Sequence, residues 1–134
     1  MPNHVIVSTL GWAAKSLEAA FAGIGEMEMG QAELAIFQAF GDLRPKALAD
    51  GGRASVDTAA LRIRDALAKN SMKRVATIYT GVGDGPLPIA EEIRRMLAVA
   101  DLAVELGVGL ITTLSSPAGT PFEAAVARLR SIAD

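Results

Sequence analysis

The sequence predicts an α/β fold: a three-layer sandwich in which helices cover both faces of a mainly parallel, open sheet of four or five strands. Two observations carry this prediction. Short apolar runs rich in β-branched residues alternate along the chain with longer segments whose apolar residues recur at helical spacing. This repeated order of strand and helix is typical of a parallel sheet, because each parallel connection needs a crossover.

The composition indicates one domain without metal or cofactor. The chain has 134 residues, enough for one core and too few for two ordinary domains. It contains no cysteine, which excludes disulfides and thiolate metal sites, and its single histidine has no partner set for another metal. We therefore expect a single domain over residues 1–134, with no metal site and no cofactor.

Charge and hydropathy exclude two further classes of protein. The formal net charge is -2 with intermixed signs, whereas a nucleic-acid binder normally displays a basic stripe. The apolar runs are interrupted well before the roughly 20 residues that a membrane span needs. The first residues also lack the pattern of a secretory signal. We expect a cytoplasmic protein that binds no nucleic acid and spans no membrane.

The first strand and helix follow one another closely. Residues 4–9 form an apolar run that predicts a buried strand, and residues 11–22 have the spacing of a helix. Gly23 and Gly25 are expected to end this helix. Trp12, just after the turn, is expected to pack, with a place in the lining of a pocket as the alternative.

The second strand is the most ambiguous element. Residues 34–37 are short enough for a strand, but residues 26–40 are also consistent with a helix. Residues 41–54 contain one proline and a glycine pair, which indicates a surface connection. Apolar residues at helical spacing then predict a helix from residue 56 to about residue 70.

The second half repeats the order. Residues 75–79 predict a strand that leads into the glycine-rich loop 80–86, and Pro88 suits the first turn of the next helix. Residues 102–108 are expected to form a further short strand.

The last helix is the best marked one. Thr120, Pro121 and Glu123 have the order of a hydroxyl cap, a first-turn proline and the carboxylate of a capping box. Four residues supply an apolar stripe: Phe122, Val126, Leu129 and Ile132.

Two turns are the expected functional region. Parallel strands end at the same edge of a sheet, and ligands bind there, near the point where the strand order reverses. The turns 8–11 and 80–86 should therefore lie on the same edge. The ligand-binding candidates are Ser8, Thr9, Leu10, Gly11, Thr80, Gly83, Asp84 and Gly85.

The two turns also match the sequence pattern of a known protein family. Residues 5–14 read VIVSTLGWAA; in that family this part of the chain is an apolar strand, a Gly/Ser-Thr/Ser-His-Gly turn and a helix. Residues 80–86 read TGVGDGP and keep the loop length, the glycine and the proline of its Asp-Gly-Gly-Ser-Pro loop; GVGL at residues 107–110 is a weaker match. The chain resembles the mannose-family IIA component of the phosphoenolpyruvate-dependent sugar phosphotransferase system, and the phosphocarrier subunit of dihydroxyacetone kinase.

The resemblance implies a phosphohistidine carrier, commonly a homodimer, that takes a phosphoryl group from a phosphocarrier protein and passes it to another transporter component. In the family an aspartate on a neighbouring strand orients the histidine. Carried over by position, the histidine falls on Leu10 and the aspartate on Thr80. The expected partners are thus the phosphocarrier protein or other components of the system, and no catalytic residue is expected.

The residues themselves exclude simple replacements for the lost histidine. Leucine has no nucleophilic atom. His4 lies at the other end of the first strand, about 20 Å from the turn at roughly 3.3 Å per residue. The hydroxyls of Ser8 and Thr9 lack a base, so we expect them to bond the turn and the first amides of the helix.

Two hypotheses stay open for this chain. The first is a degenerate, non-phosphorylatable homologue with a regulatory or partner-binding role in sugar uptake. The second is a small α/β domain that binds a phosphorylated or anionic metabolite at the two turns, with the glycine loop as an anion nest. Asp84 opposes the second hypothesis, because it places a negative charge in that loop.

Overall fold

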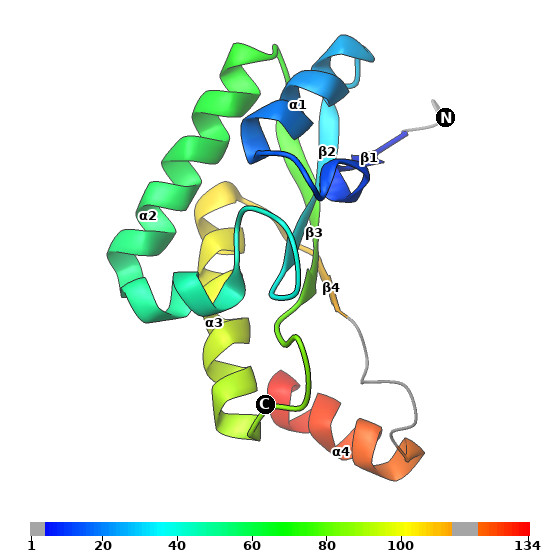
Figure 1. Cartoon of the computed structure of the whole chain (residues 1–134), viewed down its shortest axis with the longest axis vertical. Helices are drawn as coiled ribbons and strands as arrows, with labels where there is room; N and C mark the ends of the chain where they lie inside the picture. Colours follow the sequence, from blue (N-terminus) through cyan, green and yellow to red (C-terminus); the bar gives the residue numbers. More distant parts are fainter. Residues whose placement is uncertain (1–4, 114–120) are drawn as a thin grey trace.

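The computed structural model describes residues 5–113 and 121–134. Four parallel strands form one open sheet in the order β1-β2-β3-β4 (Figure 1). The strands are β1 (Val7–Ser8), β2 (Gln31–Phe37), β3 (Arg74–Gly81) and β4 (Ile111–Thr113). The helices are the 3-10 helix η1 (Thr9–Trp12), α1 (Leu17–Glu26), α2 (Pro45–Lys69), α3 (Ile89–Leu106) and α4 (Phe122–Ala133). The predicted α/β class and open parallel sheet are confirmed.

The helices are distributed unevenly around the sheet. The strands lie in sequence order, so each crossover runs in the same direction as the one before it. Right-handed crossovers of one direction leave their helices on one side of a sheet. Figure 1 shows α1, α2 and α3 together along one side, with α4 beside α3. The expected reversal of strand order is therefore wrong for the described sheet.

The core lies between the two central strands and these three helices. Ala32, Leu34 and Ile36 of β2 are fully buried, and they alternate with half-buried residues as the period of a strand requires. Each helix adds fully buried apolar side chains to the same cluster: Phe21 and Ile24 of α1, Ile63 of α2, and Val99 and Leu102 of α3. This packing fixes the elements whose ends carry the two turns.

The N-terminal elements differ from the prediction. The first strand has only two residues, and Val5 before it is 62% exposed. The helix begins at Leu17, because the side chain of Ser16 accepts a hydrogen bond from the amide of Ala19 (3.1 Å). Gly23 lies inside α1, whereas Gly25 lies one residue before its last residue, close to the expected end.

In the middle of the chain, β2 confirms the predicted strand and excludes the alternative helix over residues 26–40. The surface connection expected over residues 41–54 is wrong, because α2 begins at Pro45. A proline at the first helical position lacks only a hydrogen bond that no helix makes there. Gly52 has φ 61° and ψ -151°, so it marks a kink within α2.

The strand expected over residues 102–108 is also wrong, because these residues continue α3 as far as Leu106. Gly107 ends the helix with φ 69°, the left-handed conformation common at helix ends. The strand that follows is β4. None of the described helices has both the length and the apolar character needed to cross a membrane.

The final helix is confirmed as α4, but its expected details are not. Thr120 lies outside the described residues, and Pro121 at the N-cap has no side-chain hydrogen bond. Phe122 of the expected stripe is 80% exposed. Arg128 ties α4 to the molecule, since it pairs with Glu92 of α3 and donates to the carbonyl of Leu87.

Gly23 gives the first test of this packing. A Cβ atom built at Gly23 would lie 2.7 Å from Nε1 of Trp12, so the glycine lets the indole lie directly on α1. Alanine normally favours a helix interior over glycine by about 1 kcal/mol. We nevertheless expect Gly23→Ala to lower the free energy of unfolding by about 1–3 kcal/mol, as overpacking does. Urea unfolding followed by tryptophan fluorescence measures this change.

Gly109→Ala is the matched control, because a Cβ atom there meets nothing within 4 Å. A stabilised Gly23→Ala variant with unchanged tryptophan emission would contradict the contact.

Candidate functional site

The first turn is tied to its own backbone and to β2. The hydroxyl of Ser8 accepts a hydrogen bond from the amide of Leu10 (3.2 Å), as expected for a residue that bonds the turn. Thr9 is buried, and its hydroxyl accepts from the amide of Ala35 in β2 (2.9 Å) rather than from a helix amide. Gly11 is exposed with open space around it. The turn therefore presents Leu10, which is 37% exposed, on the surface.

Thr80 lies in the core, at the end of β3. Its side chain is fully buried, and its hydroxyl donates to the carbonyl of Ile36 in β2 (2.7 Å). A buried hydroxyl is stable when it is hydrogen-bonded in this way. Thr80 thus braces two strands and exposes no surface to a ligand.

The sheet separates the two predicted turns. They follow β1 and β3, and β2 lies between these strands. Thr9 reaches the amide of Ala35, whereas Thr80 reaches the carbonyl of Ile36. Both turns are at the carboxyl edge of the sheet, as expected, but each is bonded to β2 and not to the other.

The glycine loop after β3 is a close turn. A Cβ atom at Gly83 would lie 2.9 Å from the carbonyl oxygen of Gly85, which explains the glycine at that position. Neither glycine has a positive φ. Asp84 is exposed, and the N-cap of α3 is Pro88, so Asp84 does not cap that helix.

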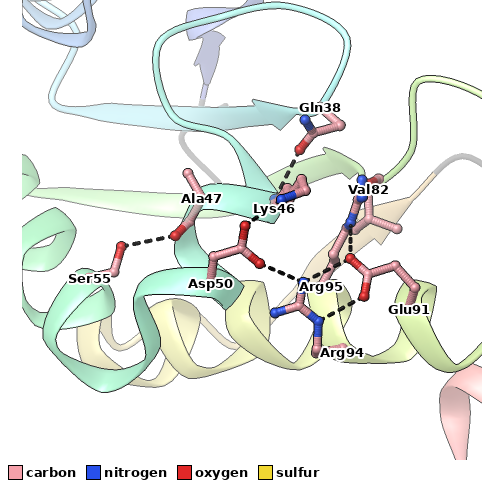
Figure 2. Close-up of polar contacts among 9 residues, drawn as sticks. All are labelled: Gln38, Lys46, Ala47, Asp50, Ser55, Val82, Glu91, Arg94 and Arg95. Carbon is pink, nitrogen blue, oxygen red and sulfur yellow. Dashed lines mark hydrogen bonds and ion pairs between the residues drawn. The ribbon is translucent and has the colours of Figure 1, made fainter.

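A network of charged side chains supports this loop from α2 and α3 (Figure 2). Arg95 is buried and donates to the carbonyl of Val82 (2.9 Å) and to Glu91 (2.8 Å). Arg94 bridges Glu91 (2.8 Å) and Asp50 (2.7 Å). These bonds join the starts of two helices to the loop, so the network is structural.

The network also lowers carboxyl pKa values. Hydrogen bonds from Arg94 and then Arg95 lower the pKa of Glu91 to about 2. Hydrogen bonds from Lys46 and then Arg94 lower the pKa of Asp50. Carboxylates held in their charged form in this way are poor proton acceptors at neutral pH.

A narrow pocket lies beside the first turn, where the turn meets the start of α1 and the loop after β2. Its volume is about 30 Å³. The large apolar residues of its lining are Leu10, Trp12, Leu17, Phe40 and Leu43. The sequence prediction missed the loop residues, although an aromatic residue just past the end of a neighbouring strand was a usable signal.

A wider depression of about 510 Å³ adjoins the pocket, because the two share Lys15, Phe40 and Asp42 in their linings. Arg44 also lines the depression. Lys15 forms no hydrogen bond or ion pair within residues 5–113 and 121–134, and Arg44 donates to the carbonyls of Gln38 and Gly41. Both cations thus lack a carboxylate partner there.

Asp42 occupies the start of α1. Its carboxylate accepts a hydrogen bond from the amide of Leu17 (2.9 Å). It also pairs with Arg62, which in turn pairs with Glu18. The hydrogen bonds from Arg62 and Leu17 lower the pKa of Asp42. The carboxylate of Asp42 is therefore already paired with a cation of the protein. It also satisfies the first amide of α1.

The buried hydroxyl of Thr80 can be tested by Thr80→Val, which keeps the shape of the side chain. We expect the free energy of unfolding to fall by about 1 kcal/mol, because the carbonyl of Ile36 loses a buried donor. Thr58→Val on the exposed side of α2 is the control and should change stability little. Equal stability of the two variants in urea unfolding would contradict a bracing role.

The acid sensitivity of the network follows from Glu91. Its pKa is about 2 in the folded protein against an ordinary value of 4.5. The stabilisation is therefore complete above pH 4.5 and is lost as the pH falls from 4.5 towards 2. We expect Glu91→Gln to be less stable than the parent protein at pH 7, and to lose less stability over that window.

Chemical unfolding at pH 7, 4.5 and 3 measures the difference. Glu26→Gln is the control, since Glu26 pairs with no other residue of the described chain. Parallel pH profiles for the parent protein and Glu91→Gln would contradict the shift.

Comparisons with known proteins add no assignment. A scan against models of protein families, a search of curated proteins and a search of solved structures each found no match. Within the described residues, no group of three or more histidine, aspartate or glutamate side chains is placed to hold a metal ion. The family resemblance rests on the residues of the two turns.

Proposed function

We propose that this chain is a IIA-like domain of the sugar phosphotransferase system that does not carry a phosphoryl group. Its role is regulatory, through binding of a partner at the first turn. The observation behind the proposal is the exposed Leu10, at the position where the resemblance puts the phosphoryl-accepting histidine. A leucine there has no nucleophilic atom, and an exposed apolar side chain suits a protein contact.

The surroundings of the turn support this proposal. Phosphoryl transfer requires an exposed nucleophile with a base or an orienting group nearby. The hydroxyls of Ser8 and Thr9 are engaged with backbone amides, and Thr80 is fully buried. The only histidine of the sequence, His4, lies outside the described residues.

Binding of an anionic metabolite at the two turns is the weaker alternative. The turns are separated by β2, and Asp84 exposes a negative charge in the second one. Sites that enclose a metabolite typically have volumes of roughly 300–1,000 Å³. The pocket at the first turn has only about 30 Å³, and the depression beside it, at about 510 Å³, is open to solvent and does not enclose a ligand. These features favour a partner protein.

The proposal extends to the setting that the resemblance implies. The partner would be the phosphocarrier protein or another component of the phosphotransferase system. The domain would act in the cytoplasm and would form a homodimer.

A phosphorylation assay tests the proposal. The purified protein is incubated with phosphoenolpyruvate, enzyme I and the phosphocarrier protein, and its intact mass is measured. We expect no added phosphate, because position 10 offers no acceptor. A stoichiometric, acid-labile phosphate on the parent protein would sink the proposal.

Leu10→His provides the complementary arm. The new imidazole would be exposed at the turn, so we expect it to gain acid-labile phosphate at a low level. Leu61→His is the matched control, since Leu61 is exposed on α2 far from the turn in sequence. A folded Leu10→His protein that stays unlabelled would argue against recognition of the first turn by the phosphocarrier protein.

A further inference from the structure

We propose that the pocket and the adjoining depression together bind an acidic segment of a partner protein, with one apolar side chain of that segment in the pocket. The inference rests on the proposed function, because it names the chemistry of the partner at the same turn. It follows from the size of the two hollows, the rigidity of their aromatic walls and the charges at their rim.

The sizes favour a protein segment. The pocket, at about 30 Å³, admits the tip of one side chain, and the depression of about 510 Å³ is open to solvent. A small pocket beside an open surface fits an anchor residue and its flanking backbone. The lining of the pocket by Leu10, Trp12 and Phe40 makes an apolar anchor the favoured one.

The aromatic walls are held before any partner arrives. Trp12 lies directly against Gly23 of α1. Phe40 stacks on Phe37 with ring centroids 4.8 Å apart, and Phe37 meets Tyr79 edge to face at 4.9 Å. Binding to preformed walls loses little side-chain entropy, which favours affinity from a small contact.

The charges at the rim select acidic neighbours for the anchor. Lys15 and Arg44 line the depression, and neither pairs with a carboxylate of the described residues. Asp42, the acidic residue of the same lining, is paired with Arg62 and accepts a hydrogen bond from the amide of Leu17. Glu18 shares Arg62 as well. The exposed positive charges are thus complementary to carboxylates that flank the anchor.

Titration with synthetic peptides, followed by backbone amide NMR, tests this inference. The probe is the capped peptide Asp-Glu-Leu-Glu-Asp; one comparison peptide replaces leucine by alanine and another replaces all four acids by lysine. We expect the probe to shift amides in residues 9–17 and 38–44. Either comparison peptide should bind at least roughly tenfold more weakly, the factor that corresponds to 1.4 kcal/mol.

Two variants with matched controls locate the contacts. Lys15→Glu and Leu10→Ser should each weaken the probe roughly tenfold. Lys73→Glu and Leu61→Ser change exposed residues of the same kinds outside both linings and should leave binding unchanged. Circular dichroism shows whether each variant keeps its fold, and only folded variants are compared.

Three results would overturn the inference: no shift in residues 9–17 and 38–44 at millimolar probe, equal binding of the lysine peptide, or equal weakening by the control variants. The test is independent of the phosphorylation assay. Binding by a protein that also becomes phosphorylated rejects the proposed function alone, and an unlabelled protein that ignores the probe rejects this inference alone.

Discussion

The carboxyl edge of this domain depends on two hydrogen bonds to consecutive residues of β2. The hydroxyl of Thr9 accepts a hydrogen bond from the amide of Ala35, and the hydroxyl of Thr80 donates one to the carbonyl of Ile36. Each bond fixes the end of a neighbouring strand against the central one, and each uses the group that the sequence alone would assign to a ligand. The hydroxyls at this edge therefore hold strands together. The exposed surface next to them is formed by Leu10 and the loop after β2.

That loop is held by a second constraint, the pairing of Arg62 with Asp42 and Glu18. Because Asp42 also accepts a hydrogen bond from the first amide of α1, the ion pairs join the loop, α1 and α2. Single exposed ion pairs contribute little to stability, but a shared arginine that also orders a helix start restricts several segments at once. Asp42 lies two residues after Phe40, whose ring stacks on Phe37, so the loop is held on both sides of the pocket wall.

Much of the fold could be predicted from the sequence, because apolar β-branched runs and helical spacing are local signals. Pro45 and Gly52 misled the prediction, since a proline fits the first turn of a helix as well as a loop, and a glycine can mark a kink. Residues 102–108 carry an apolar run that suits either element. The strand order and the pocket that both Leu10 and Phe40 line arise from tertiary contacts, which no local pattern encodes.

The two positions that the resemblance assigns to carrier chemistry are unsuited to it for reasons beyond their own side chains. An aspartate at position 80 would stand where the hydroxyl of Thr80 now meets the carbonyl of Ile36, in a fully buried site. An ionised carboxylate has no proton to donate to that carbonyl, and its burial without a partner is costly. Position 10 is on the surface and β2 lies between the two strands, so a histidine at position 10 and an aspartate at position 80 would not form the family's pair in this arrangement. A function that uses Leu10 as it stands requires neither.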